Sequence, residues 1–322
     1  MGIVPALVTL GETMALLAPE DIGPLRHADR MRLTVGGAES NVAIGAARLG
    51  LSSAWIGRVG DDELGSRVLR ELRAEGVQVH ARVDPSAPTG LMIKERRTAE
   101  TGRVWYYRRG SAGSRLHADD VDAALVAGAD VLHLTGITPG LSETARGAID
   151  AALDAAATGG TTVSLDLNHR AAVWPPEDFA AAMRALLPRA DVVFASPQEA
   201  GFVVGDGDPV TQARALARFG PPEVVLKLGA EGAVALVNGE LHRCPAVRVA
   251  VVDTVGAGDA FVAGWLAERA QGALPSVRMI TATQCGALAC TVRGDWEGSP
   301  TRAELHLLDA EAGGRPADSV RR

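Results

Sequence analysis

The sequence predicts an α/β fold: a doubly wound, mostly parallel sheet with helices on both faces, together with a small β-sheet lid. Short apolar runs rich in Val and Leu alternate with segments of helical period along most of the 322 residues. Such alternation is typical of parallel strands joined by helices. Two stretches of different pattern interrupt this order and predict the lid.

Seven runs are expected as strands, because each is apolar and is bounded by Gly, Pro, Asn or Asp. They are residues 6–11, 53–60, 130–136, 162–168, 191–196, 223–229 and 247–253. Residues 61–76 and 142–160 have the period of helices between such strands. Ligands of these sheets bind beyond the carboxyl ends of the strands. The sequence places "DLNHR", "SPQEA", "KLGAEG" and "DTVGAGD" there.

The lid is predicted from two stretches. Residues 89–110 have the pattern of a hairpin with a polar turn near Glu100 to Gly102, and residues 13–35 carry a weaker strand pattern. Neither has enough apolar residues for a core of its own, so we interpret both as one lid; an edge meander of the main sheet is the alternative. The body then comprises residues 1–12, 36–88 and 111–311, and residues 312–322 are predicted to be a disordered tail.

The composition argues against several classes of function. A formal net charge of -7 and a pI near 5.6 disfavour nucleic acid or a membrane surface as partner, because both bind a concentrated positive surface. Three cysteines without a CxxC spacing indicate reduced thiols. The N-terminus has neither a basic segment nor an apolar run that would span a bilayer, so a cytoplasmic protein is expected. The net negative charge does not exclude an anionic substrate, because arginines within the site can bind it.

Two common nucleotide-binding motifs are absent. Only two of the 32 basic residues are lysine, Lys94 and Lys227, and neither follows a glycine as a P-loop requires. The sequence "GAGDAF" has Phe261 where a dinucleotide fingerprint has its third glycine, which disfavours an oxidoreductase.

Residues 253–261, "DTVGAGDAF", form a helix start with almost no side chains. Gly256, Ala257 and Gly258 let a ligand approach the main chain, where free N–H groups and the helix dipole favour negative charge. The sequence therefore predicts an anion site. The alternative is an ordinary turn in which Asp259 only caps the helix.

Residues 36–50, "GGAESNVAIGAARLG", place a glycine pair before a second helix. Gly36, Gly37 and Asn41 can present main-chain N–H groups and an amide to a hydroxylated ligand. The alternative is that Glu39 and Ser40 are simply first-turn residues.

Together, and in this order, the two motifs resemble the G-G-x-x-x-N and D-T-x-G-A-G-D signatures of ribokinase-like (PfkB) sugar kinases. The resemblance covers residues 4–308. It implies a doubly wound fold with a β-lid, transfer of the ATP γ-phosphoryl group to a sugar hydroxyl, and Mg²⁺ as cofactor. It further implies a homo-oligomer, at least a dimer through the lid.

The resemblance also implies roles for the C-terminal motif. Gly256, Ala257 and Gly258 would form the anion hole for the transferring phosphoryl group. Asp259 would accept the proton of the sugar hydroxyl. Asp253 matches a position associated with a monovalent cation such as K⁺; an aspartate that fixes the turn is the alternative.

Further resemblances concern the nucleotide. "VVLKLGAEG" is similar to the nucleotide-binding strand and loop of the family, and "SPQEA" to its N-x-x-E element, in which Glu199 would organise Mg²⁺ through water. Ser196 stands in place of the asparagine. The cofactor-binding residues that the resemblance implies are Asn168, Arg170, Ser196, Lys227, Gly229 and Gly232.

Within the family, "VWYYRRGSAGSRL", "DLNHR" and "RGDWEG" look most like 2-keto-3-deoxygluconate kinases, which act on a sugar acid. The substrate-binding residues implied are Gly36, Gly37, Asn41, Tyr106, Arg108, Arg170 and Asp295. Met92 stands where a tyrosine is expected to touch the substrate. The alternatives are a fructokinase-like or ribokinase-like enzyme for a neutral sugar, and a non-catalytic sugar-binding protein on the same fold.

Overall fold

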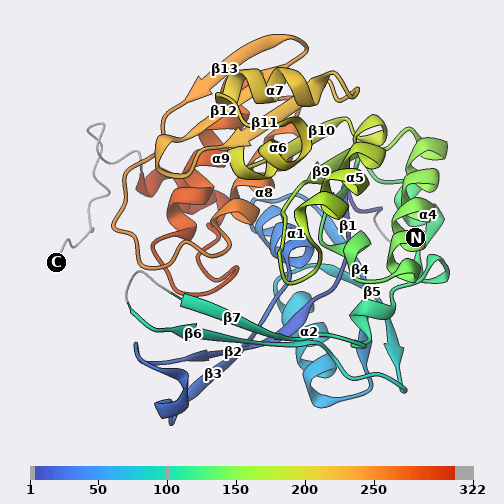
Figure 1. Cartoon of the computed structure of the whole chain (residues 1–322), viewed down its shortest axis with the longest axis vertical. Helices are drawn as coiled ribbons and strands as arrows, with labels where there is room; N and C mark the ends of the chain where they lie inside the picture. Colours follow the sequence, from blue (N-terminus) through green and yellow to red (C-terminus); the bar gives the residue numbers. More distant parts are fainter. Residues whose placement is uncertain (1–3, 99–101, 309–322) are drawn as a thin grey trace.

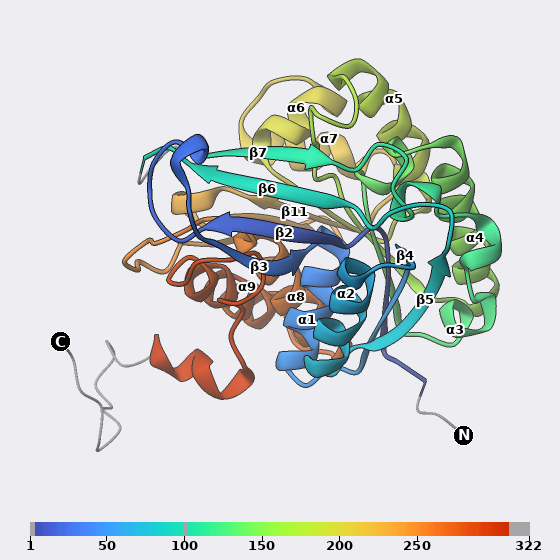
Figure 2. The same ribbon diagram turned by 90° about the horizontal axis from the view of Figure 1, so that it is seen from below.

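The computed structural model describes residues 4–98 and 102–308, which form a nine-stranded sheet between helices and a second, smaller sheet (Figures 1 and 2). The order in the large sheet is β13-β12-β11-β10-β9-β8-β1-β4-β5. Its strands are β1 Leu7–Leu10, β4 Ser53–Gly60, β5 Gln78–Asp84, β8 Val131–Thr135, β9 Thr162–Asp166, β10 Val192–Ala195, β11 Glu223–Lys227, β12 Ala233–Val237 and β13 Glu240–Cys244. The seven strands β11-β10-β9-β8-β1-β4-β5 pair in parallel. Strands β12 and β13 extend the sheet at the β11 edge in antiparallel order. The predicted doubly wound sheet is confirmed.

The strand order reverses beside β1. The chain passes from β1 through β4 to β5 on one side, and from β8 onward on the other. Open α/β sheets bind ligands in the crevice at such a reversal, beyond the carboxyl ends of the strands. The topology therefore puts the expected site next to the ends of β1 and β8.

Helices cover both faces of the large sheet, as predicted. One face packs against α3 Ala123–Ala127, α4 Glu143–Gly159, α5 Pro176–Leu186, α6 Pro197–Val204 and α7 Pro209–Ala217. The other packs against α1 Ala38–Arg48, α2 Glu63–Ala74, α8 Ala257–Ala270 and α9 Pro275–Ala289. Local signals set the ends: α4 begins where Ser142 accepts the Ala145 N–H group and ends at Gly160, which has a left-handed backbone.

The second sheet is the predicted lid. Strands β2 Met14–Pro19, β3 Met31–Gly36, β6 Leu91–Arg96 and β7 Gly102–Tyr107 have the order β3-β2-β6-β7. In the part of the chain that the structure describes, these strands pair only with one another, so the alternative of an edge meander is wrong. Met14, Leu16 and Met92 form its small core. The exact boundaries between lid and body stay a prediction. The predicted tail and most of the predicted turn near Glu100 lie outside the described residues.

One predicted strand is wrong. Residues 247–253 are without regular structure, and Val251 is 63% exposed. The Val252 N–H group bonds the carbonyl of Cys290 at the end of α9 and not a neighbouring strand. Strands β5, β12 and β13 were not predicted. Strands β5 and β13 lie at sheet edges and mix polar with apolar residues, whereas β12 is apolar and buried, so its pattern was available and was missed. β-branched residues alone do not make a strand when no partner edge is within reach.

Within the described ranges, no helix is both long and apolar enough to cross a membrane. Cys244, Cys285 and Cys290 are free thiols, and Cys285 is buried.

Candidate active site

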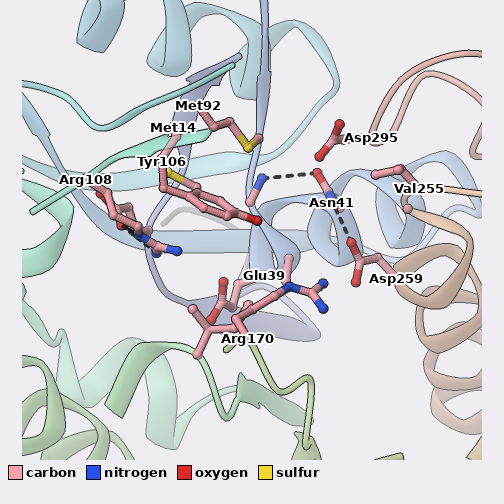
Figure 3. Close-up of a pocket in the computed structure, with 15 residues that line it drawn as sticks. Met14, Glu39, Asn41, Met92, Tyr106, Arg108, Arg170, Val255, Asp259 and Asp295 are labelled. Carbon is pink, nitrogen blue, oxygen red and sulfur yellow. Dashed lines mark hydrogen bonds and ion pairs between the residues drawn. The ribbon is translucent and has the colours of Figure 1, made fainter. Parts of the chain in front are cut away.

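A pocket lies between the lid and the carboxyl edge of the main sheet (Figure 3). It combines the start of α1, the lid strands β6 and β7, the loop after β9 and the start of α8. Its lining residues are Glu12, Met14, Gly37, Ala38, Glu39, Asn41, Met92, Tyr106, Arg108, Ile137, Arg170, Val255, Gly256, Asp259 and Asp295. Both signature motifs thus meet in one pocket although they are far apart in the chain.

Asp259 and Asn41 connect the two motifs. The Asn41 side-chain amide donates a hydrogen bond of 2.7 Å to Asp259 Oδ2, drawn as a dashed line in Figure 3. The Gly37 N–H group in turn donates to Asn41 Oδ1 at 3.4 Å. Asp259 is the third residue of α8, whose N-cap is Gly256, and the hydrogen bond that its side chain accepts comes from Asn41. The simple capping alternative is therefore wrong, and the carboxylate faces the pocket.

The environment of Asp259 makes it an unusually strong base for a carboxylate. Burial raises its pKa to about 7, against a hydrogen bond from Asn41 that lowers it; the negative charge of Asp166 raises it further. A carboxyl group with this pKa takes and releases a proton near neutral pH.

At two positions of the motifs, another segment of the backbone lies so close that only glycine fits. Gly256 has a φ of +75°, and a Cβ there would lie 1.7 Å from the carbonyl oxygen of Asp295. At Gly37, a Cβ would lie 2.4 Å from the carbonyl oxygen of Glu12. The loop of Asp295 and the residues after β1 are therefore packed directly against the two helix starts.

A buried ion pair lies beside the start of α8. Lys227 Nζ, at the end of β11, is 2.6 Å from Asp166 Oδ2, at the end of β9. Gly258 adjoins this pair, since a Cβ on it would lie 3.5 Å from Lys227 Nζ. Burial raises the pKa of Asp166, and the pKa of Lys227 is also raised, because the negative charges of Asp166 and Glu199 outweigh the burial of the ammonium.

Glu199 and Ser196 form a capping box at the start of α6. The Glu199 carboxylate accepts the Ser196 N–H group at 2.7 Å and the His169 N–H group at 3.0 Å. It thereby fixes the loop after β9, in which Asn168 has a φ of +41°.

The turn after β11 requires a glycine at position 232. Gly232 has a φ of +96°, and a Cβ there would lie 2.1 Å from the carbonyl oxygen of Cys244. Gly229, with a φ of +57°, begins this turn.

On the lid side, the charged groups are already paired. Arg108 donates from Nε to Glu12 Oε2 at 2.8 Å, with its Nη2 2.6 Å from the same oxygen. Lys94 forms a short ion pair with Asp295. Tyr106 lies next to Arg108, and Met92 packs in the lid core near Gly36. Of the residues expected to read the substrate, Arg108 and Asp295 are therefore each paired with a charged residue of the protein.

A family model described as pfkB family carbohydrate kinase matches residues 5–302. The chain belongs to this family. A 2-dehydro-3-deoxygluconokinase of Thermoproteus tenax is 40% identical over 310 residues, 94% of either chain. A 2-dehydro-3-deoxygalactonokinase of Haloferax volcanii is 36% identical over 311 residues, 95% of this chain and 98% of that protein.

A solved structure supports the fold of this carbohydrate kinase. A fructokinase double mutant from Vibrio cholerae O395, described as bound to fructose, ADP and potassium ion, superposes with a TM-score of 0.84. It is 28% identical, and the match covers 96% of this chain and 99% of that one. The predicted ribokinase-like fold with a lid is confirmed.

Two more predicted residues of the kinase are Arg170 and Asp253, of which Arg170 lines the pocket. Arg170 lines the pocket and points toward Asp259 in Figure 3; its recorded hydrogen bond within the described residues goes to the neighbouring carbonyl of His169, at 3.3 Å. Asp253 accepts the Val255 N–H group at 3.2 Å, as a turn-fixing aspartate does. Arg170 thus has a guanidinium to offer to an anion.

Four charged residues of this kinase were missed as site residues. Glu12 and Glu39 line the pocket, Lys94 pairs with Asp295, and Asp166 pairs with Lys227. Glu39, which the sequence suggested as a mere first-turn residue, is buried and accepts hydrogen bonds of 2.7 Å from Thr135 and Thr138 at the end of β8. The signal that was available for Asp166 is its place in "DLNHR", directly at a strand end.

Proposed function

We propose that the protein is a cytoplasmic kinase that transfers the γ-phosphoryl group of ATP to the C6 hydroxyl of 2-keto-3-deoxygluconate, also named 2-dehydro-3-deoxygluconate. The product is 2-keto-3-deoxy-6-phosphogluconate. One observation carries the chemistry: Asp259, held by Asn41, lies in the pocket directly beside the bare N-terminus of α8. The substrate follows from the name of the Thermoproteus tenax relative.

In this proposal Asp259 orients the sugar hydroxyl and takes its proton as the phosphoryl group is transferred. Its raised pKa, about 7, lets it accept that proton. The main-chain N–H groups at Gly256, Ala257 and Gly258 stabilise the charge on the phosphoryl oxygens, aided by the dipole of α8. Asn41 keeps the carboxylate in place and fixes the start of α1 against the start of α8.

The residues also fit a nucleotide with Mg²⁺. No group of three or more His, Cys, Asp or Glu in the described ranges is arranged to hold a metal by itself, and Mg²⁺ in kinases is held largely by phosphates and water. Asp166 Oδ1 is buried without a recorded partner, and Glu199 lies close enough to influence Asp166. These carboxylates would hold the water shell of Mg²⁺, which neutralises phosphate charge when bound. Lys227, Gly229 and Gly232 would line the nucleotide side, with Asn168 and Ser196 shaping its loops.

The lid side would bind the sugar acid. Gly36, Gly37 and Asn41 would meet its hydroxyls, Tyr106 would cover it and Asp295 would accept from a hydroxyl. Because Glu12 already occupies Nε and Nη2 of Arg108, we assign the carboxylate of the substrate to the remaining Nη1, with Arg170 shared between substrate and phosphate.

Two further features belong to the proposal. Asp253 would support a monovalent cation, as the potassium ion in the Vibrio cholerae fructokinase suggests by similarity. The exposed lid aromatics Trp105, 39% exposed, and Tyr107, 62% exposed, support a homodimer through the lid. Light scattering after gel filtration, on the protein and on a Tyr107→Lys variant, tests the dimer: a monomeric wild type would refute it.

An ADP-release assay over a panel of sugars and sugar acids tests the function. We expect the highest kcat/KM for 2-keto-3-deoxygluconate, with slower turnover of the C4 epimer 2-keto-3-deoxygalactonate. A higher value for fructose or ribose would favour the alternative of a neutral-sugar kinase, which the similarity to a fructokinase keeps as second candidate. Absence of ATP-dependent turnover on every acceptor would refute the kinase proposal.

A further inference from the structure

The chain uses arginine for 30 of its 32 basic residues, and both remaining lysines, Lys94 and Lys227, form largely buried ion pairs with an aspartate beside the pocket. Resting on the kinase function proposed above, we propose that Lys227 is a catalytic residue whose ammonium contacts the transferring phosphoryl group, and that Asp166 is the positioning residue that aims it. This chain has no P-loop, and the Lys227–Asp166 pair would do what the lysine of a P-loop does in other kinases.

The strand order brings Lys227 to the start of α8. It ends β11 and Asp166 ends β9, with β10 between them, so the lysine stem crosses the end of β10. In the register, Asp166 lies opposite Phe194 and Phe194 opposite Val225, two residues before Lys227. Phe194 and Val225 pack in the cluster with α8. Lys227 and Asp166 therefore lie on the α8 side of the sheet, at its carboxyl edge.

The distance to Gly258 places the ammonium at the anion site. A Cβ built on Gly258 would lie 3.5 Å from Lys227 Nζ, an ordinary contact distance. The same helix start carries the main-chain N–H groups that would receive the phosphoryl oxygens, of which that of Ala257 also donates to the Thr254 carbonyl at 3.3 Å. A cation at this spot adds charge stabilisation where negative charge is transferred.

A purely structural ion pair explains the arrangement less well. Buried ion pairs add little stability compared with apolar packing, because both charges lose their hydration. Among residues 4–98 and 102–308, Asp166 Oδ1 has no hydrogen-bond partner, although Asp166 is only 1% exposed. Arginine pairs with a carboxylate at least as well as lysine does. A compact ammonium is needed instead where the space beside a helix start must also admit a phosphoryl group.

The balance of the step assigns Lys227 no proton. The sugar oxygen forms a bond to the γ-phosphorus of ATP, the bond from that phosphorus to the β,γ-bridging oxygen breaks, and its electron pair leaves with ADP. The hydroxyl proton goes to Asp259. Lys227 stays an ammonium throughout, because Asp166 and Glu199 surround it with negative charge, and contributes only charge.

The test compares Lys227→Met and Lys227→Arg with the wild type, using whichever acceptor the wild type phosphorylates. We expect Lys227→Met to lower kcat about 10²–10³-fold, with KM for the sugar changed less than about threefold. Lys227→Arg should fall between the two. The matched control is Arg278→Met, which breaks a similarly buried ion pair with Glu223 (3.1 Å) away from the pocket; it should lower the melting temperature and keep kcat.

Asp166→Asn supplies a readout that a structural role would not move. Without the carboxylate the Lys227 ammonium is no longer held beside Gly258, so kcat should fall while KM for the sugar changes less than about threefold. Equal kcat in wild type and Lys227→Met, full recovery in Lys227→Arg, or an unchanged kcat in Asp166→Asn would overturn the proposal. If the wild type phosphorylates no acceptor, the function has failed; calorimetry of ATP against AMP then tests Lys227 alone. The preference for ATP should fall about tenfold in Lys227→Met, and an unchanged preference would refute the contact.

Discussion

The two sides of the pocket are built by different means. At the α8 side, the proposed anion site consists of main-chain N–H groups, and the carboxylate of Asp259 beside it is held by a neutral amide. At the lid side, recognition depends on side chains, and the charged ones are paired within the protein, Arg108 with Glu12 and Lys94 with Asp295.

This difference indicates what each side is for. Backbone donors at a helix start are fixed by the fold and serve any phosphoryl acceptor. Paired side chains present only part of their hydrogen-bonding capacity, so they select between substrates by geometry. We therefore expect changes at the α8 side to reduce turnover of all substrates, and changes at the lid side to alter the choice among them.

Asp259→Asn should give the largest effect. Asparagine keeps the size and can still accept the Asn41 hydrogen bond, but it cannot take the hydroxyl proton. We expect kcat to fall about 10²–10⁴-fold on acid and neutral sugars alike, with ATP affinity retained. Steady-state kinetics together with calorimetric ATP titration measure both. Near-normal turnover would remove Asp259 from the role of base.

The wild type supplies an internal control for this role. Because the pKa of Asp259 is about 7, kcat should fall on the acid side of neutrality as the carboxylate becomes protonated. The acid limb should be missing from the residual activity of Asp259→Asn.

Gly258→Val should rank second. The branched side chain would begin 3.5 Å from Lys227 Nζ and fill the space above the helix start. The N–H group of residue 258 stays, but blocking access to it should cost as much as losing one such donor, about 3 kcal/mol in the barrier or roughly 10²-fold in kcat. Gly258→Ala is the matched variant, because a single Cβ makes only an ordinary contact there. If Val lowered only the affinity for sugar and left kcat intact, the anion site would lie elsewhere.

The sequence was most informative where the backbone does the chemistry. "DTVGAGDAF" and "GGAESN" predicted the two helix starts that meet in the pocket, because glycines at a helix start indicate a close approach to the main chain or a positive φ. It was least informative for paired side chains. Neither Glu12 nor Asp166 stands in a pattern that announces its partner, and their partners Arg108 and Lys227 are 96 and 61 residues away in the chain. The false strand at 247–253 failed for the same reason, since its partner edge is a tertiary feature.

Arg108→Ala tests the lid side and should change selectivity. If Nη1 binds the substrate carboxylate, kcat/KM for 2-keto-3-deoxygluconate should fall by about 2–4 kcal/mol, whereas slow turnover of fructose barely changes. Equal losses on both sugars would mean that Arg108 supports lid closure or ATP.

Two variants separate recognition from packing in this experiment. Arg108→Ala leaves Glu12 buried without its cation, so Arg108→Ala with Glu12→Gln removes that unpaired charge and should recover stability without recovering selectivity. Arg103→Ala is the control and should leave selectivity unchanged, because Arg103 lies on β7, which precedes Arg108, and stacks over Trp105 at 4.0 Å.

The smallest expected effect concerns stability. The variant Asp259→Asn, which should lose activity, should be more stable than the wild type at pH 8. Burial raises the folded-state pKa of Asp259 above its ordinary value of 3.8, to about 7, so folding favours the protonated carboxyl. This contribution is present below about pH 4 and is lost as pH rises through 7. Asp259→Asn mimics the protonated form and should melt higher than the wild type at pH 8, by about 2–4 °C for each kcal/mol of stabilisation, and this difference should disappear at pH 4.

Asp62→Asn is the control, for which the opposite change in melting temperature is expected. Although burial raises the pKa of Asp62, hydrogen bonds from Thr89 and Gly65 lower it overall, so this variant should melt lower at pH 8. Thermal unfolding of the three proteins at pH 4 and pH 8 decides the matter: an Asp259→Asn protein no more stable than wild type at pH 8 would mean that the buried carboxylate is not strained, and that the α8 side holds its base without a cost in stability.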